Sequence, residues 1–197
     1  MQSIRLQQSD QNMIYLNDDI AGFDFEASLP LLSAQRREQA LKFKYEQGRK
    51  TCSAVYLLLC EGLRQEYGIT DKPVFEYGEH GKPAIVGLPH IHFNFSHCRE
   101  AAICALSNIP VGVDVESIRE YKEDLVRYTM NDKEVNEIVH SPHPDLAFTR
   151  LWTMKEAVLK LSGEGIRDDI KNVLTDIPNH FTTVVNQRRG YVYSVVY

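Results

Sequence analysis

Val111-Gly112-Val113-Asp114-Val115-Glu116 is the stretch of this chain that decides the fold. Its valines occupy every second position, which is the pattern of a β-strand with one apolar face. Because successive side chains of a strand point to opposite faces, Gly112, Asp114 and Glu116 share the other face. Two carboxylates at neighbouring positions of one face repel each other unless a cation lies between them. The stretch therefore predicts a strand whose polar face binds a cation.

A helix-like stretch follows about forty residues later and adds further charges: Trp152-Thr153-Met154-Lys155-Glu156-Ala157-Val158-Leu159-Lys160. At about 100° per residue, an apolar arc faces the core and a second arc carries the polar side chains. The apolar arc contains Leu151, Met154, Ala157, Val158 and Leu161, and the other arc contains Trp152, Lys155, Glu156, Leu159 and Lys160.

Glu156 and Lys160 have the spacing of a plain surface ion pair, which contributes little to stability. A tryptophan on the polar arc has to be covered by the protein or by a partner. Three carboxylates with nearby lysines form a donor set for Mg²⁺ and a phosphorylated substrate.

The composition describes an ordinary globular protein. The chain has 197 residues, of which 43% are hydrophobic and 25% charged, so it can bury a core without disulfides or metals. A net charge of −5 argues against a general nucleic-acid binder. The four cysteines show no C-x-x-C spacing, which leaves zinc-finger and thioredoxin-like sites without support. No apolar run is long enough to span a bilayer and the N-terminus has no apolar signal core, so we expect a cytoplasmic protein.

Two basic helices are predicted in the first third of the chain. Ser33 is a candidate N-cap for a helix that runs to about Tyr45, and a second helix spans Arg49 to Tyr67 with Gly68 as its stop. Between positions 36 and 50 there are six basic and two acidic residues. The basic ones are Arg36, Arg37, Lys42, Lys44, Arg49 and Lys50. A solvated helix face or a phosphate-rich ligand would each explain this excess.

Three strand-like runs with short links follow, at 91–96, 101–106 and 111–116. Short links favour an antiparallel meander, in which the first and third strands lie roughly 10 Å apart. His97, at the end of the first, should then lie at the same rim as Asp114 and Glu116. A first strand is also expected at residues 12–16, and a turn-rich connector at 77–83.

The last third of the chain predicts helices and a hairpin. Residues 119–140 are mostly helical, with a capping box that starts at Asn131, and a helix over 146–162 ends at Gly163. Runs at 181–185 and 191–196 predict a β-hairpin. A coarse order of strand, helices and strands occurs twice. We therefore expect a boundary near 108–110, between an N-terminal α/β half (1–109) and a C-terminal α/β half (110–197) that carries the metal site.

Other kinds of site find less support. His90-x-His92 could bind a transition metal, but no third ligand stands at a sensible spacing. Ser96 and His97 are unsuited as a nucleophile and base, because neighbours on a strand point apart. The chain has no Gly-x-Ser-x-Gly elbow, Walker loop or Gly-x-Gly-x-x-Gly loop, which excludes ordinary hydrolase, kinase and Rossmann sites.

Four motifs together resemble a known family. They are Gly81-Lys82-Pro83, Phe93-Asn94-Phe95-Ser96-His97, the strand 111–116, and the helix 152–160 with Gly163. In this order and spacing they resemble the 4′-phosphopantetheinyl transferase superfamily, in its Sfp-type branch. The resemblance covers residues 81–163 and is looser in the basic helices before them. Each motif alone is weak, and the set is specific.

The resemblance implies a fold and an activity. The implied fold is of the α/β (α+β) class, with two similar α/β halves packed as a pseudo-dimer in one chain. Such enzymes move the phosphopantetheine arm of coenzyme A onto a serine of an apo acyl or peptidyl carrier protein. They require Mg²⁺ and release adenosine 3′,5′-bisphosphate. The resemblance also suggests a monomer, and the net charge and the short apolar runs lead us to expect neither nucleic acid nor a membrane as a partner.

The resemblance also implies roles for individual residues. Asp114, Glu116 and Glu156 would hold Mg²⁺, and Glu156 would be the base for the incoming serine hydroxyl, directly or through water. Lys160 and His97 would contact the coenzyme A pyrophosphate, Lys155 would position a phosphate, and Ser96 would also belong to the coenzyme A site. Lys82 and Pro83 would lie near the nucleotide and its 3′-phosphate. Arg49 or Lys50 would bind that 3′-phosphate, with Arg36 and Arg37 as weaker candidates. Catalysis would fall to Glu156, Lys160 and His97.

Two alternatives stay open beside this interpretation. A non-catalytic relative could bind coenzyme A or a carrier protein, although a binder has no need of three repelling carboxylates. An unrelated Mg²⁺-dependent enzyme could act on another nucleotide diphosphate, although the basic segment 36–50 suits a ligand with an extra phosphate. The sequence does not identify the carrier protein or its pathway.

Overall fold

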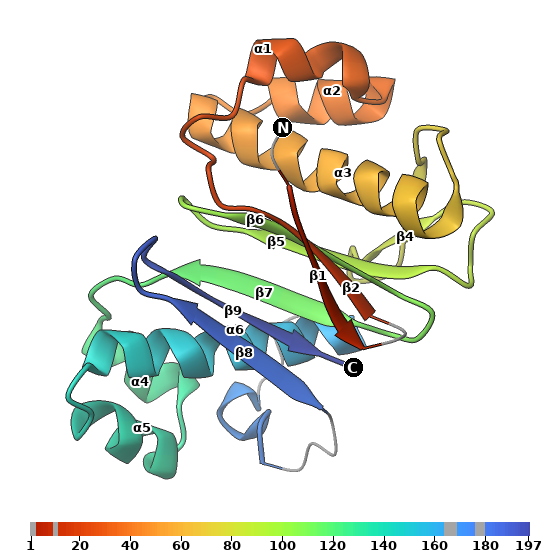
Figure 1. Ribbon diagram of the computed structural model, residues 1–197. Coiled ribbons are helices and arrows are strands. Elements are labelled where there is room, and N and C mark those ends of the chain that lie inside the picture. The colour runs from red at the N-terminus through yellow and green to blue at the C-terminus, as the bar shows by residue number, and fades with distance from the viewer. Residues whose placement is uncertain (1–2, 10–11, 164–168, 176–179) are drawn as a thin grey trace.

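The computed structural model describes residues 3–9, 12–163, 169–175 and 180–197, and it has a mixed α/β architecture (Figure 1). The first sheet has the strand order β1-β2-β6-β5 and is antiparallel throughout. Its strands are β1 (Ile4–Ser9), β2 (Asn12–Asn17), β5 (His92–His97) and β6 (Ala102–Ser107). The long helix α3 (Glu46–Tyr67) lies across one face of this sheet, with α1 (Phe25–Ser28) and α2 (Ala34–Leu41) on its outer side (Figure 1).

The second sheet has the order β7-β9-β8 and is also antiparallel. It is made of β7 (Gly112–Ser117), β8 (Phe181–Asn186) and β9 (Tyr191–Val196). Helix α6 (Pro144–Ser162) lies along its outer face, and α4 (Glu123–Thr129) and α5 (Asp132–Val139) lie beyond it (Figure 1). The smaller elements are the 3-10 turns Leu29–Leu31 and Ile170–Asn172 and a hairpin of β3 (Phe75–Tyr77) and β4 (Pro83–Ile85).

Three apolar clusters hold these layers together. One lies between α3 and the first sheet, and a second fills the space between the two sheets. Strand β6 contributes to both, with Cys104 and Leu106 toward α3 and Ile103 toward the second sheet, so all six of its residues are buried. The third cluster joins α4, α5 and α6. Among the described residues, no helix is long and apolar enough to cross a bilayer.

The expected three-stranded meander is wrong in its third strand. Strands β5 and β6 pair as predicted, but β7 pairs with β9, far along the chain, and joins the second sheet. Strand β6 already has β2 on one edge and β5 on the other, so no edge is left for β7. The short link between β5 and β6 therefore predicted their pairing correctly. At the link between β6 and β7 the chain passes from the first sheet to the second.

The ends of most predicted helices are confirmed. The Ser33 hydroxyl caps α2, and Gly68 and Gly163 end α3 and α6 with φ angles of 67° and 72°. The capping box between Asn131 and Glu134 is present. Helix α2 ends at Leu41 instead of about Tyr45, and strands β1, β3 and β4 had not been expected.

The predicted apolar arc of α6 is only partly correct. Leu151 and Ala157 are buried as expected, but Thr153, Lys155 and Leu159 are also buried, whereas Met154, Val158 and Leu161 are half-buried. The reason is that α6 is covered by the second sheet on one side and by α5 and the segment after α6 on the other. The predicted boundary at 108–110 falls in the link between the two sheets. The division into halves 1–109 and 110–197 and their pseudo-dimeric relation stay predictions.

Candidate active site

Asp114 is the centre of a polar cluster where β5, β7 and α6 meet. Its side chain is only 3% exposed, and Oδ1 accepts hydrogen bonds from Ser96 Oγ at 2.7 Å and from Lys160 Nζ at 2.5 Å. Lys160 Nζ also donates to Ser96 Oγ at 2.9 Å. The other oxygen, Oδ2, is buried and has no hydrogen-bond partner among the described residues. Asp114 therefore retains one buried acceptor that a further ligand could use.

The alternation of residues along two strands explains why these side chains meet. The valines of β7 pack between the sheets, so Gly112, Asp114 and Glu116 face α6, as the repeat of two predicts. In β5, Phe93 packs toward α3, and the next residues of the opposite set, Asn94 and Ser96, reach α6 and β7. Because β5 and β7 are edge strands of different sheets, the expected separation of roughly 10 Å is replaced by a direct hydrogen bond.

Two further carboxylates lie close enough to Asp114 to be perturbed by it. Burial and the charge of Asp114 raise the pKa of Glu116, against which a hydrogen bond from the Trp152 indole acts. Burial and the same Asp114 charge raise the pKa of Glu156, and Lys160 opposes that shift. In both glutamates burial is the larger cause, so a cation bound beside them would favour their charged forms.

Trp152 is partly covered by the protein, because its side chain is half-buried. Its ring stacks on Phe148 with centroids 6.2 Å apart and an interplanar angle of 15°. Together with Glu116, Tyr121 and Leu125, the two rings line a hollow of about 460 Å³. The indole therefore packs against a ring of its own helix and donates a hydrogen bond to the Glu116 carboxylate.

The carboxylates of Asp114, Glu116 and Glu156 suit a hard divalent cation, although they do not surround a common point. Among the residues that the structure describes, no three His, Cys, Asp or Glu side chains gather closely enough to hold a metal ion as they are placed. The Lys160 ammonium instead neutralises Asp114. Three carboxylates with a buried, unpartnered oxygen are nevertheless the ligand chemistry that Mg²⁺ prefers. The residues present therefore fit such an ion once Lys160 moves.

A cavity of about 250 Å³ opens beside the cluster. Lys82, Pro83, Asn94, Phe95, Glu156 and Lys160 are among the residues that line it. Lys82 Nζ donates to the Leu161 carbonyl at 2.8 Å, and burial lowers the pKa of this lysine. Lys82 and Pro83 also line a neighbouring hollow of about 630 Å³, which includes His92. Because they share Lys82 and Pro83, the two hollows adjoin, one beside Glu156 and the other beside the β3–β4 hairpin.

Strand β5 contributes Asn94 to the lining of this cavity and ends at His97. The His97 side chain is exposed at the strand end, and partial desolvation by the surrounding protein, followed by the Lys160 charge, lowers the pKa of its ring. The Asn94 amide donates to the Lys160 carbonyl at 3.3 Å and so ties β5 to α6.

Comparison with known proteins identifies the family. Residues 110–194 match the model of the 4′-phosphopantetheinyl transferase superfamily. The chain is 34% identical over 139 residues to the 4′-phosphopantetheinyl transferase AcpT of Salmonella typhimurium, which covers 67% of this chain and 69% of that protein. It is 25% identical over 156 residues to the 4′-phosphopantetheinyl transferase Sfp of Bacillus subtilis, covering 78% and 70%. A second Bacillus subtilis 4′-phosphopantetheinyl transferase is 27% identical over 157 residues, with the same shares. The chain belongs to the 4′-phosphopantetheinyl transferase superfamily.

Most of the polar cluster lies in the part that matches the superfamily model. Asp114, Glu116, Glu156 and Lys160 fall within residues 110–194, whereas Lys82, Ser96 and His97 precede them. The matched part thus supplies the carboxylates and a lysine, and the preceding part supplies the opposite wall of the cavity.

Lys155 has a different place in this superfamily member from the one the sequence suggested. Its side chain is fully buried, and Nζ donates to the carbonyls of Ile170 and Lys171 at 2.9 Å each. Nζ also lies 2.9 Å from a carboxylate oxygen of Glu134. The expected phosphate contact is therefore corrected, because α6 turns Lys155 away from Glu156 and into the space beneath α5.

The basic segment also holds the first helices together in this superfamily member. Arg49 Nε donates to the Phe43 carbonyl, and Lys50 Nζ donates to the Ala21 carbonyl, each at 2.9 Å. Neither residue lines the two hollows beside the carboxylates. The buried Arg36 guanidinium lies over three aromatic rings (those of Tyr56, Phe75 and Phe95), and Arg37 donates to the Leu29 carbonyl. Contacts of Arg49 or Lys50 with a 3′-phosphate stay predictions.

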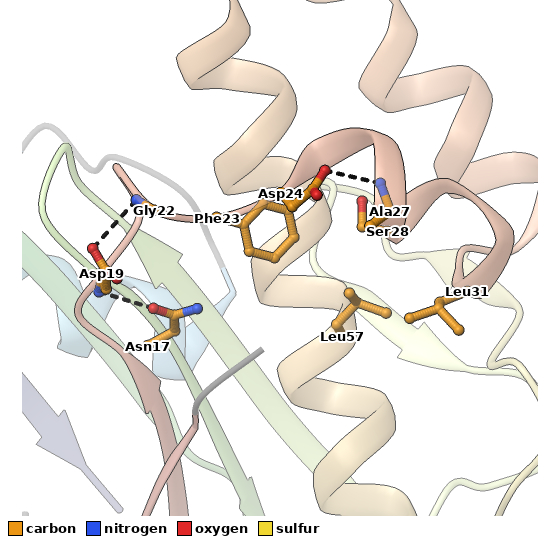
Figure 2. Close-up of a pocket in the computed structure, with 9 residues that line it drawn as sticks. All are labelled: Asn17, Asp19, Gly22, Phe23, Asp24, Ala27, Ser28, Leu31 and Leu57. Carbon is orange, nitrogen blue, oxygen red and sulfur yellow. Dashed lines mark hydrogen bonds between the residues drawn. The ribbon is translucent and has the colours of Figure 1, made fainter.

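Another hollow, of about 280 Å³, lies at the start of α1 and is shown in Figure 2. Its two carboxylates accept backbone hydrogen bonds, Asp19 from Gly22 N and Asp24 from Ala27 N. Asn17 accepts from the Asp19 backbone, and Leu31 and Leu57 line the apolar side (Figure 2). These contacts shape a loop and a helix start, and none of the residues of the polar cluster lines this hollow.

Proposed function

We propose that this protein transfers the phosphopantetheine arm of coenzyme A to a serine of an apo acyl or peptidyl carrier protein and releases adenosine 3′,5′-bisphosphate. The observation that carries the proposal is the hydrogen-bonded group of Asp114, Ser96 and Lys160 beside a cavity of about 250 Å³ that Lys160 and Glu156 line. The names of the relatives, all 4′-phosphopantetheinyl transferases, support the same reaction.

The reaction is a substitution at phosphorus. The serine oxygen forms a bond to the phosphorus that bears the pantetheine arm, and the bond from that phosphorus to the bridging oxygen of the diphosphate breaks. The leaving bisphosphate takes the electron pair, and the serine gives up a proton. Such reactions gain mainly from positioning and from neutralising charge, so the protein needs cations at the diphosphate and a base at the hydroxyl.

Asp114, Glu116 and Glu156 are the residues that would hold Mg²⁺. The buried and unpartnered Asp114 Oδ2 supports this assignment, as do the raised pKa values of the two glutamates. A bound Mg²⁺ supplies positive charge that stabilises the leaving bisphosphate. Lys160, which lines the cavity and donates to Ser96, would contact the diphosphate together with His97 and Ser96.

Lys82 and Pro83 would bind the nucleotide end of coenzyme A. Both lie at the junction of the two hollows, and Lys82 brings a positive charge to that position. Arg49 or Lys50 would reach the 3′-phosphate after giving up their contacts with backbone carbonyls. The extra phosphate of coenzyme A is the feature that this second set of cations would select.

Glu156 is the candidate base. Its carboxylate lines the cavity, and its raised pKa makes it a better proton acceptor than an ordinary glutamate. It would take the serine proton directly or through one water. The proposal extends to a monomeric, cytoplasmic enzyme built from two similar halves, and it leaves the carrier open.

The test is incubation of the protein with coenzyme A, MgCl₂ and a panel of apo-carrier proteins, followed by intact-mass measurement. We expect a carrier to gain the mass of one phosphopantetheine group, and the same carrier with its acceptor serine replaced by alanine to gain none. Asp114→Ala and Glu156→Ala should abolish the gain, whereas Asp71→Ala, in the exposed loop before β3, should not. Coenzyme A binding without any gain across the panel would overturn the proposal in favour of a non-catalytic relative.

A further inference from the structure

Lys160 supplies the positive charge that the buried Asp114 needs in the ligand-free protein. Asp114 is 3% exposed, and an isolated carboxylate in such a place is strongly disfavoured. The ammonium of Lys160 lies 2.5 Å from Oδ1 and also donates to Ser96. The same oxygen accepts from Ser96, so the hydrogen bonds gather on Oδ1 while Oδ2 stays unpartnered.

The Lys160 side chain is free to leave this position without a change of fold. It projects from the last turns of α6, its side chain is 30% exposed, and it lines the cavity of about 250 Å³. Lysine has a long, flexible stem that ends in a compact charge, and it can therefore follow an anion over several ångströms. Asn94 bonds to the Lys160 backbone and would hold the helix in place while the side chain moves.

A divalent ion and the Lys160 ammonium would repel each other if both were bound to the Asp114 carboxylate. An ion bound through Oδ2 would stand beside an ammonium that is already 2.5 Å from Oδ1 of the same carboxylate. Two cations at such a separation repel each other strongly in a partly buried site. A diphosphate in the cavity would remove this conflict, because it offers the ammonium another anion and adds negative charge around the metal.

We propose that Lys160 is a built-in counter-ion of Asp114, which holds the metal position until a diphosphate ester enters the cavity and draws the ammonium away. The inference rests on the proposed function for the metal position at Asp114 and for the identity of the diphosphate. Metal and diphosphate then bind cooperatively, and each raises the affinity for the other by the same factor. The affinity of the protein for the metal ion is therefore low when the substrate is absent.

The test measures Mn²⁺ binding to the metal-free full chain in the absence of coenzyme A, by the electron paramagnetic resonance signal of free Mn²⁺. We expect Lys160→Met and Lys160→Gln to bind Mn²⁺ roughly 5- to 150-fold more tightly than the wild type, the usual range of such coupling. The glutamine variant keeps a hydrogen-bond donor and serves if the methionine variant is poorly folded. Lys133→Met, which removes an exposed lysine of α5, is the matched control and should leave the affinity unchanged.

Two results would overturn the inference. One is an unchanged or weaker Mn²⁺ affinity in both Lys160 variants, and the other is an equal tightening in Lys133→Met. Adding Asp114→Asn to Lys160→Gln should remove the tightening, which assigns it to Asp114. These outcomes do not depend on a transfer assay. The inference can therefore fail while the proposed reaction stands, and the proposed reaction can fail while the inference stands.

Discussion

At the scale of single residues, two lysines of one helix have opposite environments. Lys160 reaches the cavity and neutralises Asp114, whereas Lys155 is fully buried between Glu134 and two carbonyls. The family resemblance implied a phosphate contact for each of them, because both belong to the same motif. Burial separates their roles, since a lysine without solvent or a cavity beside it cannot reach a ligand.

Replacing Lys155 should destabilise the protein. Lys155→Met leaves the Glu134 carboxylate buried without its partner, and breaking a buried pair in this way costs about 3 kcal/mol or more. Urea unfolding followed by circular dichroism measures the loss. The double variant Lys155→Met, Glu134→Gln should recover part of it, because no lone charge remains and glutamine can keep the capping box. Equal stability of Lys155→Met and the wild type would show that the pair contributes nothing.

At the scale of elements, the contact between β7 and α6 sets the geometry of the site. A Cβ at Gly112 would lie 2.0 Å from the Ala157 carbonyl oxygen, so only glycine lets the strand approach the helix this closely. Two residues further along β7, Asp114 meets Lys160 from the same helix. The hydroxyls of Thr153 and Ser194 add a buried hydrogen bond of 2.8 Å between α6 and β9. The same close packing that brings the carboxylates to α6 therefore also depends on Gly112.

Gly112→Ala should separate these two elements. The added methyl group meets backbone that cannot move aside, and we expect a loss of unfolding free energy of about 3 kcal/mol or more, with loss of transfer activity. Gly78→Ala is the matched control, because its nearest atom would be the Lys82 carbonyl oxygen at 3.7 Å and its effect should stay within about 0.5 kcal/mol. Thermal unfolding of both variants measures the difference. Similar melting temperatures would argue against the close approach.

Strand β1, which the sequence did not predict, is held to α3 by an exposed ion pair. Arg5 donates two hydrogen bonds to the Glu66 carboxylate, and the Tyr15 hydroxyl donates to it from β2. The hydrogen bonds from Arg5 lower the pKa of Glu66 against the cost of its partial burial. A short strand with few apolar residues is difficult to recognise when a side-chain contact far along the chain holds it.

This pair should make stability depend on pH in the acidic range. Because the folded-state pKa of Glu66 is lowered, its contribution is present above the unfolded pKa and is lost as the pH falls through the folded value. Glu66→Gln should therefore lower stability at neutral pH and reduce its decline on acidification. Chemical unfolding of both proteins between neutral pH and about pH 3 tests this. A decline of the same size in both would rule out a contribution from Glu66.

At the scale of the whole molecule, the site lies where two sheets and one helix meet, and no single element contains it. Ser96 comes from the first sheet, Asp114 from the second, and Lys160 from the helix outside it. The three apolar clusters that hold the layers together include none of these polar side chains. The fold should therefore persist when the proposed metal is withdrawn.

Removing divalent ions should stop transfer without unfolding the protein. With excess EDTA, we expect no mass gain on the carrier and a circular dichroism spectrum equal to that of the untreated protein, because the cores are apolar. Adding MgCl₂ beyond the chelator should restore activity. Undiminished transfer in EDTA would contradict the assignment of the carboxylates, and loss of the folded spectrum would mean that the ion is structural.

The sequence by itself determined the local features. Alternation placed Asp114 and Glu116 on one face of β7, and glycines and capping residues gave the ends of α3, α5 and α6. The four motifs also pointed to the superfamily to which the chain belongs. These features depend on residues within a few positions of each other, and short-range sterics and hydrogen bonding fix them.

The tertiary structure alone decided which strands pair and which charges meet. The pairing of β7 with β9, the contact of Ser96 with Asp114 and the burial of Lys155 all join residues that are distant in the chain or covered by distant segments. Such contacts arise from the burial of apolar faces against one another, and a pattern along one segment does not specify its partner. Each strand also has only two edges, so β2 and β5 decide where β7 can go by occupying those of β6.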